Sequence, residues 1–189
     1  MTNSKDFEAF RHGLVVSKVW LCEQLEPILE KNYTNPSVNI LGGWHNVLSF
    51  IMQVRKPNYY KEIISYDKDE SVKTIADLIC DTWKYEVSKV SNITSDTTDI
   101  NFDIGIFINC SVDQYIDDSW YRNIPHGSLV CMQTTNIMDE NPLWEINQRT
   151  PDLNTFKQKY QLDSILYEGV KEIRYDHFGY DRLMLIGYK

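Results

Sequence analysis

The stretch Val38-Asn39-Ile40-Leu41-Gly42-Gly43-Trp44-His45-Asn46 decides which fold the sequence predicts. A short apolar run ends on two glycines and passes directly into a segment with helical spacing, residues 47–54. A buried parallel strand delivers the chain to a phosphate- or nucleoside-binding turn in this way. We therefore expect a strand over residues 38–41, a tight turn, and a helix over residues 46–56 that stops before Pro57.

A second apolar strand, residues 62–66, is followed at once by the carboxylate of Asp67. Gly43 and Asp67 are 67 − 43 = 24 positions apart, close to the strand-helix-strand distance at which an acidic side chain meets ribose hydroxyls. Two carboxylate oxygens can accept hydrogen bonds from two vicinal hydroxyls. The pattern favours a nucleoside cofactor, and the alternative is a plain strand-helix connection in an α/β core.

The bulk composition limits the function classes. At 189 residues, 42% of them hydrophobic, the chain fits one globular domain that can bury a core without disulfides or metals. Its 19 Lys and Arg against 27 Asp and Glu give a net charge of −8, and no basic run is present, so general binding to nucleic-acid backbones is disfavoured. No stretch reaches the length of a membrane span and no secretory signal is evident, so we expect a cytoplasmic protein without a membrane partner.

Cysteines and histidines give no sign of a metal site or a disulfide framework. The cysteines lie far apart in apolar stretches without a CxxC pair, and we expect four buried thiols: Cys22, Cys80, Cys110 and Cys131. The four histidines are scattered without paired spacing, so we predict that the protein holds no metal.

Helices and strands alternate over the rest of the chain. We expect a helix over residues 7–31, divided near Gly13 and Ser17 and kinked or restarted at Pro27. Further helices are predicted over residues 70–85, 117–123 and 153–160, the last with Asp152 as its N-cap. Further strands are predicted over residues 87–93, 102–109, 128–134, 164–174 and 181–189. Residues 135–151 lack a clear period and suggest a long functional loop.

This order of elements resembles the class I S-adenosylmethionine-dependent methyltransferases, and more closely the small methyltransferase-like proteins of phages and bacteria. The motifs that carry the closer resemblance are Ser17-Lys18-Val19-Trp20-Leu21-Cys22-Glu23, Leu41-Gly42-Gly43-Trp44, Asn109-Cys110-Ser111, Trp120-Tyr121-Arg122-Asn123-Ile124-Pro125-His126-Gly127 and Arg182-Leu183-Met184-Leu185-Ile186-Gly187. The resemblance implies an N-terminal helical segment, residues 1–37, packed on a Rossmann-like methyltransferase domain, residues 38–189. It also implies a mostly parallel seven-stranded sheet with a C-terminal antiparallel hairpin.

The resemblance further implies S-adenosylmethionine as the cofactor and assigns its contacts. The turn Gly42-Gly43-Trp44 would pass the methionine part, with His45 near its carboxylate. Asp67, followed by Lys68, would hold the ribose diol. Asp96 and Thr97 would approach the adenine, and Asn109 with Ser111 would face the transferable methyl group and the acceptor.

The sequence departs from the family pattern at several of these positions. Trp44 and Asn46 replace two glycines of the usual turn, although Asn46 tolerates a positive φ. The acidic residue common in the first strand is absent. Relatives tend to carry a glutamate and a histidine shortly after the fourth strand, where this chain has Asp113 and Gln114.

Methyl transfer needs alignment of donor and acceptor and, for a protonated acceptor, a base. Asp113 is the candidate base if it is partly buried, or else a capping carboxylate. Asn109 and Ser111 either orient the acceptor or only close the strand end. Three interpretations stay open: a methyltransferase with an unidentified acceptor such as a small molecule, a catalytically inactive binding or structural protein of the same fold, and a different nucleotide-dependent enzyme such as a reductase. The terminal hairpin or the Trp20 helix could also form a homo-oligomer.

Overall fold

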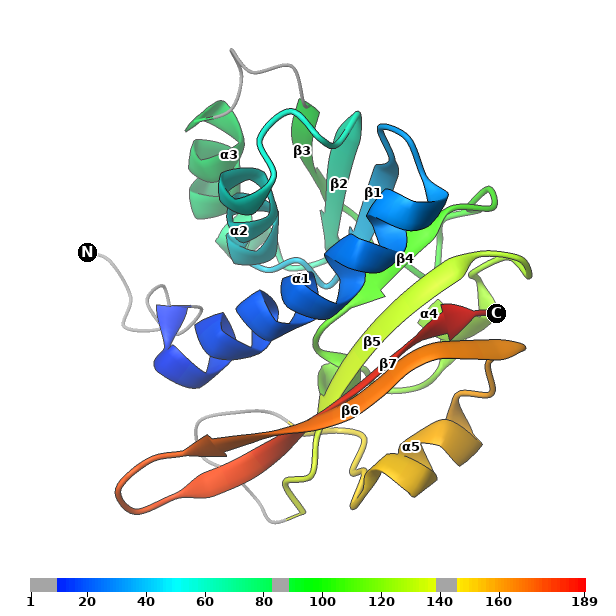
Figure 1. Ribbon diagram of the computed structural model, residues 1–189. Coiled ribbons are helices and arrows are strands. Elements are labelled where there is room, and N and C mark those ends of the chain that lie inside the picture. The colour runs from blue at the N-terminus through cyan, green and yellow to red at the C-terminus, as the bar shows by residue number, and fades with distance from the viewer. Residues whose placement is uncertain (1–9, 83–88, 139–145) are drawn as a thin grey trace.

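A single mixed sheet forms the centre of the computed structural model, which describes residues 10–82, 89–138 and 146–189 (Figure 1). The spatial order is β3-β2-β1-β4-β5-β7-β6, with β1 to β5 parallel and β7 antiparallel to both β5 and β6. The strands are β1 (Ser37–Leu41), β2 (Glu62–Asp67), β3 (Lys89–Thr94), β4 (Ile106–Asn109), β5 (Leu129–Thr135), β6 (Ser164–Arg174) and β7 (Gly179–Tyr188). The predicted seven-stranded, mostly parallel sheet with a C-terminal antiparallel hairpin is confirmed.

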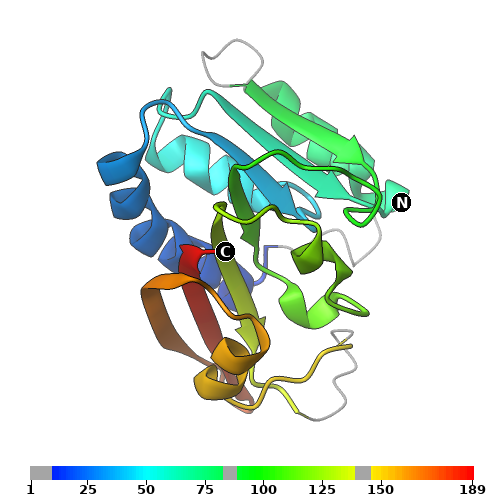
Figure 2. The same ribbon diagram turned by 90° about the vertical axis from the view of Figure 1, so that its right-hand side faces the viewer.

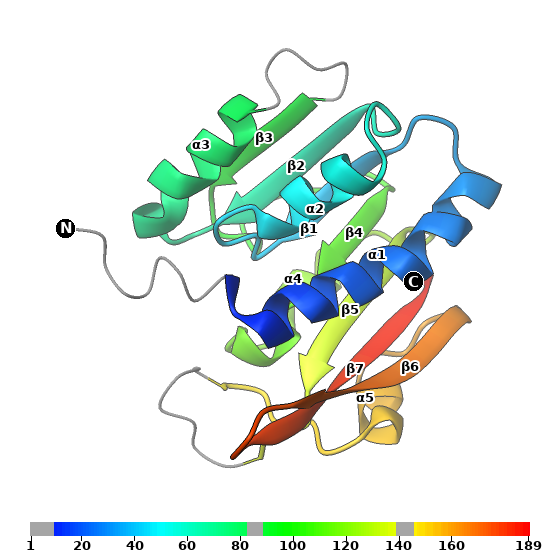
Figure 3. The ribbon, with the colours of Figure 1, turned by 60° about the vertical axis from the view of Figure 1, so that its left-hand side comes forward.

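Helices cover both faces of the sheet, as buried parallel strands require. One face carries α1 (His12–Asn32), α2 (Val47–Arg55) and α3 (Lys73–Thr82), which stand in front of the sheet in Figure 3. The other face carries α4 (Ser119–Arg122) and α5 (Leu153–Lys159), which come forward in Figure 2. Two apolar cores result, one between α1, α2 and the sheet, the other between the sheet, α4 and α5. No helix in the described part of the chain is long and apolar enough to cross a membrane.

The helix α1 is continuous from His12 to Asn32, so its predicted division at Ser17 and its predicted restart at Pro27 are wrong. The chain is non-helical at Arg11, two residues before Gly13, and residues 7–9 of the predicted helix lie outside the described part of the chain. Gly13 lies in the first turn, where its N–H donates to Tyr175 Oη at 2.9 Å. Ser17 Oγ donates back to the Leu14 carbonyl at 2.9 Å, which the helix tolerates. Pro27 removes one helical N–H, but the leucines around it anchor the helix in the core, because Leu25 and Leu29 are fully buried. Tertiary packing overrides the local signals.

Other element boundaries differ from the prediction in ways that have local causes. The fourth strand begins at Ile106 rather than at residue 102, because Ile104 is 70% exposed and Phe102 packs instead on the rings of Tyr66 and Phe107. The predicted helix at 70–85 begins as a separate 3₁₀ turn, Glu70–Val72, and residues 83–88 lie outside the described part of the chain. The Asp152 N-cap is confirmed, since its Oδ1 accepts from the Thr155 N–H at 2.7 Å.

Three of the four cysteines are buried, whereas Cys80 is half-buried, which corrects the expectation for that residue. All four are free thiols. Burial raises the pKa of Cys80 to about 11, so this thiol stays protonated at neutral pH.

A bidentate ion pair joins the two helices that cover the first core. Arg55 Nε and Nη2 donate to Glu26 Oε1 and Oε2 at 2.8 and 2.9 Å, and Glu26 is only 5% exposed. Arg55→Ala would leave this carboxylate without a counter-ion, so we expect a loss of about 2 kcal/mol in the free energy of unfolding in urea. The control is Lys56→Ala, which removes an exposed pair between Glu30 of α1 and the residue that follows α2, and it should change stability far less. Equal losses would contradict this explanation.

Candidate functional site

The candidate site lies at the carboxyl edge of the parallel strands, where the chain order of the sheet reverses. β1 pairs with β2 on one side and with β4 on the other, so the connections that leave β1 and β4 run in opposite directions. In open α/β sheets ligands bind in the crevice outside such a switch point. The turn after β1 and the segment after β4 are therefore the two walls of the candidate site.

The turn after β1 is left-handed at three positions, although only one of them is a glycine. Gly42 has φ +68°, and the non-glycine residues Trp44 and Asn46 have φ 50° and 60°. The Gly42 and Gly43 N–H groups both donate to the Tyr66 carbonyl, at 2.9 and 3.0 Å. Asn46, which we expect to tolerate a positive φ, does adopt one and is the N-cap residue of α2. Trp44 and Asn46, which replace two glycines of the family pattern, therefore still adopt the left-handed backbone of the turn.

Gly43 is required by close packing. A Cβ atom built on it would lie 1.6 Å from Ser65 Oγ on β2, far inside any contact distance. The turn therefore approaches the neighbouring strand so closely that only glycine fits.

Asp67, at the end of β2, lies directly beside this turn. Its Oδ2 accepts from the Trp44 N–H at 2.8 Å, and its Oδ1 accepts from the Asp69 N–H at 3.0 Å. Each carboxylate oxygen has a further lone pair, so both can still accept a hydroxyl donor. Asp67 thus fixes the strained Trp44 backbone and presents an acceptor pair at the switch point.

His45 and Lys68, the other predicted residues near the turn, have different surroundings. His45 is 2% exposed and stacks on Trp44 with ring centroids 5.1 Å apart. Its Nδ1 is buried without a hydrogen-bond partner among the described residues. Lys68 is exposed to solvent, and no side-chain contact ties it to the turn in the described part of the chain.

Tyr115 brings the segment after β4 against the turn. Its Oη would lie 3.1 Å from a Cβ built on Gly42. Burial raises the pKa of its phenol, which lies next to Thr97 and is close enough to Asp67 and Asp96 to feel their charges. Asp96 itself accepts from the N–H and the Oγ1 of Thr98, at 3.0 and 2.9 Å. The structure therefore gathers four of the predicted cofactor positions, Gly42, Asp67, Asp96 and Thr97, around one tyrosine that the sequence analysis did not single out.

The residues that end β4 are buried. Asn109 is fully buried, and its Oδ1 accepts from the Ser111 N–H at 3.0 Å, while its Nδ2 has no partner among the described residues. This bond is the strand-closing interaction expected of the pair, and the unused Nδ2 donor keeps the acceptor-orienting role open. Cys110 is buried between them.

Asp113 lies in a buried polar cluster on the α1 face of the sheet. It is 4% exposed, and its Oδ2 accepts from Thr135 Oγ1 at 3.2 Å. Its Oδ1 is 3.9 Å from Nη1 of Arg182 and accepts no hydrogen bond from any described residue. Burial raises the pKa of Asp113, while the Arg182 guanidinium and the Thr135 hydroxyl act against that rise.

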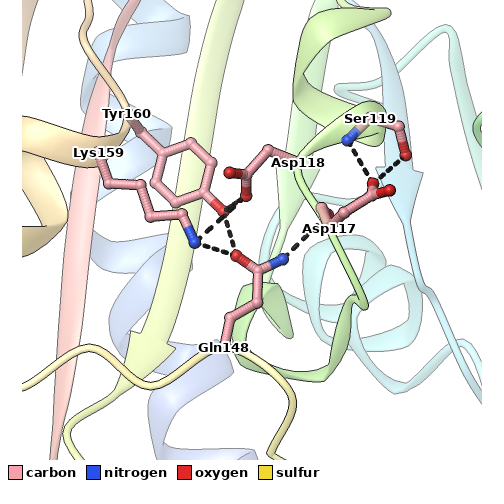
Figure 4. A network of polar contacts seen from close by, with 6 residues as sticks. All are labelled: Asp117, Asp118, Ser119, Gln148, Lys159 and Tyr160. Carbon is pink, nitrogen blue, oxygen red and sulfur yellow. Dashed lines mark hydrogen bonds and ion pairs between the residues drawn. The ribbon is translucent and has the colours of Figure 1, made fainter.

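The backbone of this segment is held by the residues before α5. The Asn147 and Gln148 N–H groups donate to the Asp113 carbonyl at 2.8 and 3.0 Å. Figure 4 shows how Gln148 is fixed in turn, since its Nε2 donates to the Asp117 carbonyl at 2.9 Å and its Oε1 faces Lys159 and Tyr160. The predicted functional loop therefore contributes through residues 146–151, which hold the backbone around Asp113 in place. Residues 139–145 of that loop lie outside the described part of the chain.

Three residues that the sequence analysis missed contribute to this edge: Tyr115, Lys18 and Arg182. Lys18 could have been noticed, because it is the one charge in the run Val15-Val16-Ser17-Lys18-Val19-Trp20-Leu21-Cys22. Arg182 similarly precedes an apolar strand run. Tyr115 gave no signal, because its contact with Gly42 depends on how two distant loops meet.

Solved structures share this fold. Magnesium protoporphyrin IX methyltransferase from Synechocystis PCC 6803, with S-adenosylmethionine bound, matches with TM-score 0.61 and 14% identity over 99% of this chain and 85% of that one. The methyltransferase SibL in its apo form matches with TM-score 0.59 and 11% identity over 92% of this chain and 55% of that one. The YcgJ protein of Bacillus subtilis matches with TM-score 0.62 and 10% identity over 88% of this chain and 98% of that one. No protein-family model and no curated protein sequence matches the chain. The chain therefore has the class I methyltransferase fold.

Proposed function

We propose that the protein is an S-adenosylmethionine-dependent methyltransferase that acts on a small-molecule acceptor. The observation that carries the proposal is the 2.8 Å bond from the Trp44 N–H to Asp67 Oδ2. It fixes a carboxylate beside a left-handed glycine turn at the switch point of the sheet, where a nucleoside would bind. The shared fold supports the proposal, because a structure of that fold contains S-adenosylmethionine.

The residues at the site fit this cofactor. Asp67 would accept from the two ribose hydroxyls, and Asp96 and Thr97, which lie near Tyr115, would flank the adenine. His45 Nδ1 is an orphaned buried polar atom at the turn and would meet the methionine end. The bound cofactor would supply an electrophilic methyl group on its sulfonium.

The chain's own residues would align the acceptor and take up its proton. Asn109 Nδ2 is a buried donor without a partner among the described residues, so it can hold an acceptor atom in line with the methyl group. Asp113 would be the base, because the burial that raises its pKa makes its carboxylate a stronger proton acceptor. Ser111 lies between them at the strand end and would add a hydroxyl contact.

A small acceptor suits these surroundings better than a nucleic acid. The net charge of −8 opposes approach of a phosphate backbone. Asp113 is 4% exposed, so only a small group could reach its carboxylate.

A thermal-shift panel tests the cofactor assignment. At about 100 times the dissociation constant, a ligand of the native state adds roughly 2.7 kcal/mol, which raises the melting temperature of a domain of this size by about 5–10 °C. We expect such a rise with S-adenosylmethionine and S-adenosylhomocysteine and none with NAD. Stabilisation by NAD alone would favour a reductase and contradict the proposal.

A further inference from the structure

Two buried basic side chains, Lys18 and Arg182, lie near each other beside the ends of β4 and β5. Lys18 on α1 is 7% exposed and Arg182 on β7 is 3% exposed, and Asp113 is the only carboxylate among the described residues that forms an ion pair with either of them. Buried charges are normally paired and hydrogen-bonded. Arg182 has one carboxylate beside it and Lys18 has none among the described residues, so this pair of basic side chains is incompletely compensated.

Packing brings these two cations together from distant parts of the chain. α1 crosses the sheet over β4 and β5 (Figure 3), and Gln133 Nε2 on β5 donates to the Ser17 carbonyl at 3.0 Å, next to Lys18. Arg182 on β7 is the register partner of Thr135 on β5, whose hydroxyl binds Asp113. Lys18 is close enough to Arg182 and to the Cys110 thiol for both to influence its pKa, which burial lowers.

The hydrogen-bond donors of both cations are almost unused. A guanidinium and an ammonium together carry about eight N–H donors. In the described part of the chain neither side chain donates a hydrogen bond, and the Nε of Arg182 is buried without a partner. The one ion pair, at 3.9 Å between Arg182 Nη1 and Asp113 Oδ1, is too long to be a hydrogen bond. The cluster therefore offers donors and positive charge to an incoming acceptor of hydrogen bonds.

We propose that Lys18 and Arg182 form a binding site for a carboxylate group of the methyl acceptor, so that the substrate is an organic acid. This inference rests on the proposed function for the identity of the ligand as an acceptor. Arg182 can bind a carboxylate through two parallel N–H···O bonds, and Lys18 adds a point charge. The carboxylate would lie beside Asp113, which places the rest of the acceptor at the proposed base.

The cofactor also carries a carboxylate, at its methionine end, so the experiment must distinguish the two sources. Under the proposed function the cofactor's methionine part would lie beside the turn after β1, with His45, whereas Lys18 lies near Cys110, and Arg182 lies near Asp113, at the end of β4. The surroundings therefore favour the acceptor.

The test follows the Arg182 Nε–H resonance by NMR while benzoate is added as the probe, with benzamide as its uncharged counterpart. We expect benzoate to shift this resonance and benzamide to leave it in place. Lys18→Met should weaken benzoate binding at least 10-fold, because it removes one of the two charges. Lys31→Met, at an exposed position on the same helix, is the matched control and should bind benzoate as the wild type does.

The melting temperature of Lys18→Met is an independent test of the proposal. Because Lys18 is a buried basic side chain without a close anionic partner among the described residues, Lys18→Met should raise the melting temperature while it weakens benzoate binding. A lower melting temperature with unchanged benzoate binding would show that Lys18 is structural and would overturn the proposal. Lys18→Arg, which keeps the charge, should retain most of the binding.

Calorimetry with S-adenosylhomocysteine and 5′-methylthioadenosine shows whether Lys18 and Arg182 bind the carboxylate of the cofactor or that of the acceptor. If Lys18→Met weakens S-adenosylhomocysteine but not 5′-methylthioadenosine, which lacks the amino-acid part, the site holds the cofactor's carboxylate and the proposal falls. If the wild type binds benzoate but no S-adenosylhomocysteine, the carboxylate site stands and the proposed methyltransferase function falls.

Discussion

Gly43→Ala is expected to weaken S-adenosylhomocysteine binding by at least about 100-fold and to lower the melting temperature. The added Cβ would lie 1.6 Å from Ser65 Oγ, so either the turn or β2 must move. Forcing an atom into a packed interior costs about 3 kcal/mol at the upper end of the usual range, and that energy corresponds to roughly 150-fold in affinity. Calorimetric titration and thermal unfolding measure the two effects.

Two further variants test whether the effect of Gly43→Ala comes from the contact with Ser65. Adding Ser65→Ala removes the hydroxyl and leaves the serine Cβ at 3.0 Å from the new atom, so the double variant should recover part of the lost affinity. Gly105→Ala, with no neighbour closer than 3.5 Å to its Cβ and a place before β4 at the other end of the sheet, should behave as wild type. Equal losses at Gly43 and Gly105 would show that the turn has no special role.

Asp67→Ala should strongly weaken cofactor binding. The carboxylate would accept from two ribose hydroxyls, and two charge-assisted bonds of about 1.5 kcal/mol each amount to about 3 kcal/mol. The substitution also removes the acceptor of the Trp44 N–H, which loosens a turn with φ 50° at a non-glycine residue. We expect a loss of at least about 100-fold in affinity for S-adenosylhomocysteine.

Asp67→Asn and Asp103→Ala separate the two roles of Asp67. The asparagine Oδ1 can still accept from the Trp44 N–H, so Asp67→Asn should keep the turn and lose only part of the affinity. Asp103 is an exposed carboxylate near the amino end of β4, and its removal should leave binding unchanged. Wild-type affinity in Asp67→Ala would remove this residue from the cofactor site.

Local signals in the sequence were sufficient for the parts of the fold that short segments determine. β1 and β2 are apolar runs bounded by a glycine turn and by Asp67, and each lies within one residue of its predicted range. The neighbouring positions of the turn and Asp67 follow from parallel strands that end at one edge. In contrast, α1 runs through Ser17 and Pro27 because its buried side chains pack against distant strands, and no local signal contains that information.

Long-range packing determines the parts of the site that the sequence did not indicate. Tyr115 meets Gly42 only because β4 lies beside β1 in the sheet. Lys18 and Arg182 are 182 − 18 = 164 positions apart in the sequence and become neighbours because α1 packs across the sheet. The residues that would select the acceptor are therefore those that the sequence alone indicated least.

Calorimetric titration of the wild-type protein with S-adenosylmethionine and S-adenosylhomocysteine tests the central claim most directly. The proposed site, with its glycine turn, Asp67 and the buried His45, predicts one binding site per chain with micromolar affinity for both ligands. No heat of binding and no thermal shift at millimolar concentrations of either ligand would contradict it and would leave a methyltransferase fold without its cofactor.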